Sequence, residues 1–267
     1  MNLVDTGVRF DKGAHTYTTA DGLPLQGVTP IVAWMFPRTY DGIPEEVLLR
    51  AAQYGSMVHA AIETYCVTGL QDGSSYIVDF GDMITSNNLE VVRNEYLVTD
   101  GKAVASSIDL VMTRNGEIVL GDIKTTSQLH IENVRLQLSI YAYLFEMQTG
   151  ESVAKLVAVW IPKPQYGLSK MVEVERIPSD VCEGIINAYL AGGSPDPWRK
   201  AIGVNTLPVE TSNTALMSIK EMEREIVAIE TEAKRLKEQS EKLRDGLLKI
   251  RTNWKLSKIT RLFPENY

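Results

Sequence analysis

The sequence predicts a mixed α/β protein, in which a β-sheet is flanked by helices and followed by a long C-terminal coiled-coil helix. Short apolar strands alternate with amphipathic helical stretches over residues 8–191, which is typical of a sheet covered by helices. Asn115 and Gly116 lie between two apolar runs, and this dipeptide strongly favours a β-hairpin. Heptad spacing of apolar residues begins near residue 213. We therefore expect a folded body at 1–205 and a helical coiled-coil appendage at 206–267.

The N-terminal part of the chain should contain a short β element and at least two helices. Residues 8–28 alternate apolar and polar side chains around turn residues, as short strands do. Thr29 is suited to cap a helix that has Pro30 at its first position. A second helix should begin at Pro44 and either continue through Gly55 or restart there. Its later part is amphipathic, with one apolar face formed by Val58, Ala61, Ile62, Tyr65 and Cys66.

The remainder of the body should supply most of the sheet. Apolar runs bounded by turn residues predict strands, and a long stretch with two apolar stripes predicts a largely buried helix. In order, we expect strands at 91–98, 103–112 and 117–124, the buried helix at 130–148, strands at 153–161 and 171–177, a helix near 179–191 and a loop at 194–197.

Residues 213–251 differ in kind from the body. Apolar residues there repeat at alternating spacings of three and four, which predicts a left-handed coiled coil or a long helical hairpin arm. A single helix of this length cannot bury such a stripe on itself. No Pro or Gly interrupts residues 213–245, and Gly246 comes too late for a balanced hairpin. We therefore expect a homo-oligomer that pairs through residues 213–251.

Composition limits the classes of protein and partner. The net charge of −7 argues against coating nucleic acid with a broad basic surface, but it allows local binding through cations and a few basic side chains. Cys66 and Cys182 are the only cysteines, so the chain cannot supply the four ligands of an iron–sulfur cluster. No apolar run approaches the ~20 residues of a membrane span. We expect a cytoplasmic protein without a membrane partner.

The predicted hairpin around Asn115-Gly116 brings charged residues together. With a two-residue loop, Asp109 lies directly opposite Asp122, and Lys124 shares their face. Facing carboxylates destabilise a sheet, so a divalent cation between them would explain why both are present. A bulged three-residue loop would shift the pairing by one and separate them.

The hairpin charges and two further candidates, His59 and Gln137, also have purely structural interpretations. The hairpin charges could lie on a solvated face, although they interrupt apolar runs, where ionised groups are costly unless paired or metal-bound. His59 lies on the border of an apolar helical stripe and could simply hydrogen-bond Glu63. Gln137 lies in the buried helix one turn before Tyr141, and a buried amide requires partners.

These segments resemble, in order and spacing, the motifs of the PD-(D/E)xK nuclease superfamily, in particular its RecB-like and phage-type exonucleases. The resemblance spans roughly residues 8–190. It is carried by a G-x-x-x-H helix, an Ile-Asp-Leu strand, an Asp-Ile-Lys-Thr strand and a Q-x-x-x-Y helix, at Gly55–His59, Ile108–Leu110, Asp122–Thr125 and Gln137–Tyr141. It implies a restriction-endonuclease-like fold and metal-dependent hydrolysis of DNA. We expect an exonuclease acting on linear DNA in phage-type recombination or DNA processing, located in the host cytoplasm if phage-encoded.

The resemblance also implies roles for individual residues. Oxygen ligands favour Mg²⁺ or Mn²⁺, and a histidine ligand shifts the preference toward Mn²⁺. An iron–sulfur cluster is not expected. By resemblance, the metal would be bound by His59, Asp109, Asp122 and the Ile123 carbonyl, Lys124 would orient or activate water, and Gln137 and Tyr141 would support the site or the DNA.

Glu95 is a provisional addition, because such nucleases often carry a glutamate on the strand before the aspartate. A two-residue Asp100-Gly101 turn places Glu95 opposite Ser106, on the other face from Asp109. A type I turn with Gly101 as a bulge restores the same face. The sequence leaves both turns open.

A protein of a different class remains as the alternative. The chain could be a catalytically inactive, nuclease-like DNA-binding or scaffold protein that assembles through its coiled coil. Asp109, Asp122 and Lys124 are all present, which favours the enzyme, since a decayed site would tolerate replacement of any of them.

Overall fold

The computed structural model describes residues 3–204 and Lys237. The predicted coiled coil at 213–251 therefore falls, Lys237 apart, outside the described residues. That helix, its role in assembly and the domain boundary at residue 205 stay predictions. Among the described residues, no helix combines the length and apolarity needed to cross a membrane.

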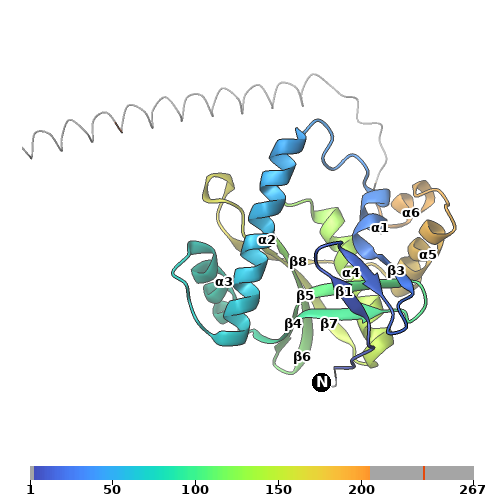
Figure 1. The fold of residues 1–267 in the computed structure, drawn as a ribbon, viewed down its shortest axis with the longest axis horizontal. Coiled ribbons are helices and arrows are strands. Elements are labelled where there is room, and N and C mark those ends of the chain that lie inside the picture. The colour runs from blue at the N-terminus through green and yellow to red at the C-terminus, as the bar shows by residue number, and fades with distance from the viewer. Residues whose placement is uncertain (1–2, 205–236, 238–267) are drawn as a thin grey trace, which may run out of the picture. The chain divides into compact units, whose positions relative to one another are not determined.

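A mixed sheet of eight strands runs through the described part of the chain (Figure 1). Its path is β1-β2-β3-β5-β6-β7-β8, with β4 paired to β5 off this path. The β3–β5 and β6–β7 pairs are parallel and the other pairs are antiparallel. The strands are β1 Arg9–Asp11, β2 Thr16–Thr18, β3 Pro24–Gly27, β4 Glu90–Thr99, β5 Val104–Arg114, β6 Glu117–Lys124, β7 Val153–Trp160 and β8 Lys170–Val174.

Helices cover both faces of the central strands (Figure 1). One apolar core joins α1, α4 and α5 to the sheet, and a second joins α2 and α3 to the opposite face. The apolar positions of β6 alternate between these cores, as a strand buried on both faces requires. The helices are α1 Val28–Met35, α2 Glu45–Thr68, α3 Ser75–Ser86, α4 Ile131–Thr149, a 3₁₀ turn η1 Pro164–Tyr166, α5 Ser179–Leu190 and α6 Asp196–Ala201.

Most predicted elements are confirmed to within a few residues, and α2 continues through Gly55. Three details were wrong. Helix α3 was not predicted, because its glycine and β-branched residues are poor helix formers, but Phe80 packs it against α2. Helix α6 begins at Asp196, where a loop was predicted, since the proline that follows is compatible with a first helical turn. Thr29 lies inside α1, whose N-cap is Gly27.

One edge of β5 pairs with β3 near its start and with β6 near its end, while the other edge pairs with β4. Ala105 pairs with both β4 and β3, so β3 lies on the edge opposite to β4. The same edge pairs with β6 only over residues 110–114. Among the described strands, none pairs with residues 106–109 on this edge. The sheet therefore opens at the stretch that ends in Asp109.

Candidate metal centre

A cleft of about 780 Å³ lies over this opening in the sheet. The β1–β2 hairpin, α2 and the ends of β5 and β6 all contribute to its lining. An exposed ion pair between Lys12 and Glu63, with a nitrogen–oxygen distance of 3.2 Å, links the hairpin to α2. The cleft is therefore bordered by segments that are far apart in the sequence.

The two-residue hairpin loop at Asn115-Gly116 is confirmed, and its register continues as far as the pair Leu110–Gly121. The expected cross-strand pair of Asp109 and Asp122 does not form, because the ladder ends one residue earlier. Instead, Oδ2 of Asp109 accepts a hydrogen bond of 2.7 Å from the backbone N–H of Ile123. A side chain thus takes the place of the next rung of the ladder.

The reason is a change of face within β5. Ile108 packs into the core on the α4 side, whereas Leu110 packs into the core on the α2 side. Residues two apart normally share a face, so the strand turns between them, at Asp109. The side chain of Asp109 is 13% exposed and reaches the α2 side of the sheet, while Asp122 extends toward α4.

Glu95 on β4 lies where the ladder would place it opposite Asp109, between the pairs Tyr96–Ile108 and Asn94–Leu110. Both turns considered for the β4–β5 connection were wrong, because the loop spans residues 100–103 and is capped by a side chain. The same-face placement is nevertheless correct. Glu95 has a left-handed backbone with φ +47°, which is uncommon for a non-glycine residue within a strand.

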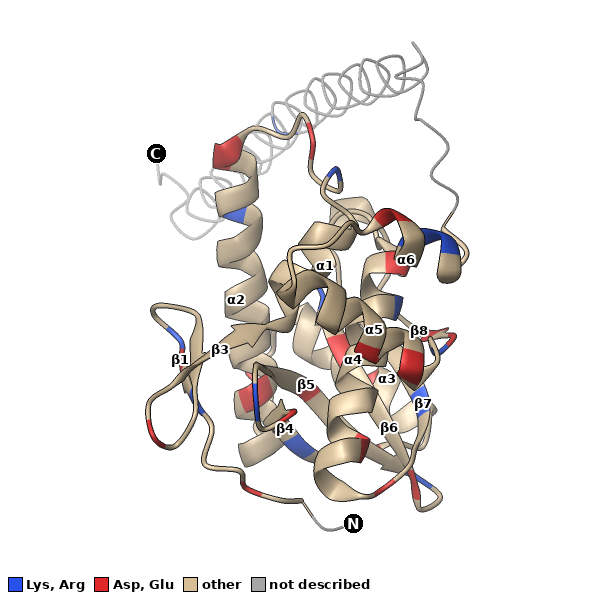
Figure 2. Cartoon of the chain, turned by 90° about the vertical axis from the view of Figure 1, so that its right-hand side faces the viewer, with Lys and Arg blue, Asp and Glu red and all other residues tan. Residues whose placement is uncertain are grey.

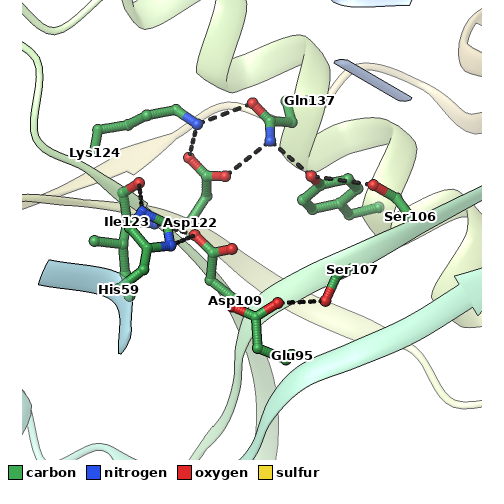
Figure 3. Close-up of polar contacts among 10 residues, drawn as sticks. His59, Glu95, Ser106, Ser107, Asp109, Asp122, Ile123, Lys124 and Gln137 are labelled. Atoms are coloured by element: carbon green, nitrogen blue, oxygen red, sulfur yellow. Dashed lines mark hydrogen bonds and ion pairs between the residues drawn. The ribbon is translucent and has the colours of Figure 1, made fainter. Parts of the chain in front are cut away.

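His59 completes the group from α2 (Figure 3). Its Nε2 lies 3.0 Å from the carbonyl oxygen of Ile123, and its Nδ1 lies 3.7 Å from Oδ2 of Asp109. Ligand atoms of His59, Glu95 and Asp109 all lie within 4.8 Å of one another. Glu63, the suggested local partner of His59, forms its ion pair with Lys12 instead.

The donor set fits a metal on chemical grounds. A carbonyl oxygen only accepts, so Nε2 of His59 must donate to Ile123. In the neutral ring, Nδ1 then presents a lone pair toward the carboxylate of Asp109. Two acceptors facing each other require a proton or a cation between them, and imidazole with carboxylates is a common ligand set for divalent metals.

Asp122 belongs to a neighbouring network rather than to this three-residue group. Its carboxylate is 1% exposed, and its Oδ2 lies 2.6 Å from Nζ of Lys124. That contact is an ion pair without the geometry of a hydrogen bond. Gln137 donates from Nε2 to Oδ1 of Asp122 at 2.9 Å and to the Tyr141 hydroxyl at 2.6 Å. Its Oε1 accepts from Lys124 at 3.1 Å (Figure 3). The amide of Gln137 is half-buried rather than fully buried, and it has the partners that the sequence led us to expect.

The charges of the site alter its acid–base properties. Burial raises the pKa of Asp109 to about 7, with further increases from Asp122 and Glu95 and an opposing effect of His59. Burial acts to lower the pKa of Lys124, but the negative charges of Asp122 and Asp109 outweigh it, and the pKa is raised. Lys124 therefore stays protonated and can donate, but cannot act as a base in this state.

Two serines of β5 belong to the site and were not predicted. Ser107 donates from Oγ to Oε2 of Glu95 at 2.7 Å, and Ser106 contacts the Tyr141 hydroxyl at 3.3 Å. The signal was present as two consecutive polar residues in an otherwise apolar strand, just before Asp109. These serines line the part of β5 that neither β3 nor β6 covers.

Two solved structures are distantly similar to this chain. No family model and no curated protein matches the chain. A crystal structure of SSO0001 is similar with a TM-score of 0.39 and 17% identity, over 64% of this chain and 77% of that one. An alkaline exonuclease from Laribacter hongkongensis (LHK-Exo) is similar with a TM-score of 0.34 and 15% identity, over 68% of this chain and 95% of that one.

Proposed function

We propose that this chain is a metal-dependent nuclease that hydrolyses phosphodiester bonds in DNA. The observation that carries the proposal is the position of the His59, Glu95 and Asp109 donors beside a protonated lysine in one cleft. A bound Mg²⁺ or Mn²⁺ would lower the pKa of a water molecule and stabilise charge on the phosphate. The charge pattern agrees with local rather than broad contact, since basic and acidic residues are interspersed over the described elements (Figure 2).

Under this proposal, different residues of the site would bind the metal and orient the water. His59, Glu95 and Asp109 would hold the metal, with the Ile123 carbonyl beside them. Lys124 would donate hydrogen bonds to the attacking water or to a phosphate oxygen.

The network behind Lys124 would set its position. Asp122 keeps Lys124 charged and near the metal group. The resemblance also implies a role as a further metal ligand, whereas in the structure its oxygens contact Lys124 and Gln137. Gln137 contacts both Lys124 and Asp122, so α4 controls where the ammonium group points. Tyr141 supports Gln137 from the next turn of the same helix.

The finer proposal is exonucleolytic action on linear DNA, which rests on the motif resemblance. The test uses end-labelled linear DNA and circular DNA of the same sequence, with Mg²⁺, with Mn²⁺ and with EDTA. We expect metal-dependent loss of the linear substrate and survival of the circular one. Cleavage of both substrates would indicate an endonuclease.

Two variants assign the activity to the site. Asp109→Asn should abolish cleavage, because it removes a charged metal ligand. Asp82→Asn changes an exposed aspartate of α3 that does not line the cleft, and it should retain full activity. Absence of metal-dependent cleavage by the wild type would overturn the proposal and favour an inactive nuclease-like DNA-binding protein. Near-normal cleavage by Asp109→Asn would show that the site is elsewhere.

A further inference from the structure

We infer that the β1–β2 hairpin stacks one unpaired nucleobase beside the metal group, on an aromatic platform formed by Phe10, His15 and Tyr17. The inference rests on the proposed function and deepens it, because it names the form of nucleic acid that the cleft accepts. The substrate would be a single-stranded end or a frayed terminus, not a fully stacked duplex.

The three rings form one continuous cluster. Phe10 and Tyr17 stack with their centroids 4.6 Å apart and their planes at 20°. His15 packs edge-on against Phe10, with the centroids 5.2 Å apart and the planes at 79°. Exposure increases along the cluster, because Tyr17 is buried, Phe10 is partly buried and His15 is exposed. The cluster therefore has an anchored end and an open end.

The platform lies in the same cleft as the metal group. All three rings line that cleft, together with His59 and Asp109. Burial raises the pKa of the Tyr17 hydroxyl, and Ser106 and Ser107 beside it oppose that shift. Since Ser107 in turn holds Glu95, the base of the platform is connected to a metal donor through a single residue. A nucleotide whose phosphate contacts the metal would have its base near these rings.

The conformation of His15 gives an independent argument. Its backbone is left-handed, with φ +54°, a conformation that is uncommon for residues other than glycine, although asparagine and histidine adopt it more often than most. The turn before it is held by Oδ1 of Asp11, which accepts from the N–H groups of Gly13 and Ala14. A residue in this uncommon conformation that is also exposed and lines the candidate site is a candidate for a functional contact.

A packing role explains only part of the cluster. Tyr17 and Phe10 belong to a small core with Val8 and Leu25, but an exposed His15 adds little to that core. Aromatic rings that line a nucleic-acid cleft commonly stack bases, and stacking tolerates any sequence because every base has a π face. In a duplex both faces of an internal base are already covered. The platform therefore selects a base with a free face at an end or in a single strand, and a single-stranded or frayed end offers such a base most readily.

The test measures stacking directly and does not require cleavage. The probe is a short single-stranded oligonucleotide carrying 2-aminopurine at successive positions from one end, bound to the full-length protein with Ca²⁺ replacing Mg²⁺. Stacking quenches 2-aminopurine fluorescence, so we expect quenching concentrated at one position. An abasic nucleotide at that position should weaken binding by wild type roughly tenfold, in the range of one lost stacking contact.

Paired variants separate stacking from folding. His15→Asn removes the ring but suits the left-handed backbone, so the protein should stay as stable as wild type while the quenching is lost. His15→Phe keeps a ring in a strained backbone, so it should be less stable but retain the quenching. Tyr166→Ala removes an exposed aromatic ring outside the cleft and should change neither property. In His15→Asn, the abasic substitution should cause no additional loss of affinity.

The outcomes distinguish this inference from the proposed function. If wild type cleaves DNA with metal but His15→Asn keeps the quenching, or still loses affinity for the abasic probe, the platform is wrong and the nuclease stands. If position-specific quenching depends on His15 but no metal cleaves DNA, the stacking site stands and the nuclease is wrong. Absence of both quenching and cleavage overturns both.

Discussion

At the residue scale, the surroundings of the Asp109 carboxyl group favour one protonation state and metal binding favours the other. The carboxyl group is almost buried, it lies near two other carboxylates, and it accepts a hydrogen bond from the Ile123 N–H. Burial and like charges favour its neutral form, whereas metal binding requires the charged form. The stability of the protein should therefore depend measurably on the proton of Asp109 and on the presence of a divalent metal.

The first prediction concerns the stability of the metal-free protein. The pKa of Asp109 is about 7 in the fold against about 4 for an ordinary aspartate, so the folded state holds the extra proton between these values. Stability from this group is complete below pH 4 and is lost as pH rises through 7. In EDTA, we expect the melting temperature of wild type to fall between pH 5 and pH 8 by several degrees more than that of Asp109→Asn. Parallel curves for the two proteins would contradict the assignment.

The second prediction concerns Lys124. An ammonium group that orients water acts mainly in the transition state, so Lys124→Ala should lower kcat by about 100-fold or more with little change in KM. Metal and single-stranded DNA binding should be retained, as measured by calorimetry and fluorescence anisotropy. Because the variant leaves Asp122 without its ion-pair partner, circular dichroism must show that it is folded. A variant with raised KM and normal kcat would identify Lys124 as a phosphate anchor instead.

At the element scale, the site depends on where β5 and β6 separate. The strands pair tightly up to Leu110 and Gly121 and then diverge. A Cβ on Gly121 would approach the Leu110 Cβ to 3.2 Å and the Met112 Cε to 2.7 Å. The methionine end can move, but the leucine Cβ is fixed to the backbone. The close approach of the strands therefore requires glycine next to the site.

The third prediction follows from this contact. Gly121→Ala should push β6 away from β5 and destabilise the protein by about 1–3 kcal/mol, which corresponds to a fall of roughly 2–4 °C in melting temperature for each kcal/mol. Activity should fall as well, because Asp122 and Ile123 follow directly on the displaced strand. Gly116→Asn changes the turn of the same hairpin, where the φ of +85° suits asparagine better than most residues, and it should have the smaller effect. Equal melting temperatures for wild type and Gly121→Ala would show that the sheet absorbs the extra methyl group.

At the scale of the whole molecule, the chain joins a described body to a C-terminal segment known here only from its sequence. If residues 213–251 form the predicted helix, its heptad stripe is apolar and must be covered by another surface. A helix of ~39 residues would be about 58 Å long, longer than a typical element of a small domain. Pairing between two such helices is the simplest way to bury the stripe.

The fourth prediction is that the full-length protein is a homo-oligomer. Light scattering at micromolar concentration should give a mass above that of one 267-residue chain. Truncation after residue 210 should weaken assembly while leaving a folded body that still cleaves DNA, because the candidate site lies entirely within the described residues before 205. A monomeric full-length protein would remove the coiled-coil pairing proposal.

Local signals in the sequence determined the elements and much of the hairpin. Asn115 and Gly116 both have positive φ, as their two-residue loop requires, and this set the register of β5 and β6. The position of Gln137 in a helix predicted to be buried indicated a polar network, because an amide without partners is too costly inside a protein. Such features depend on neighbours along the chain or on a general energetic rule, so they can be deduced without coordinates.

Only the tertiary structure decided which groups share the candidate metal site. It turned β5 at Asp109, separated Asp109 from the expected cross-strand pairing with Asp122, and brought Glu95 and His59 to the same point. It also brought the β1–β2 hairpin and α2 to one cleft, with His15 facing it. These placements arise from a strand that changes face and from packing between distant segments, and neither leaves a periodic pattern in the sequence.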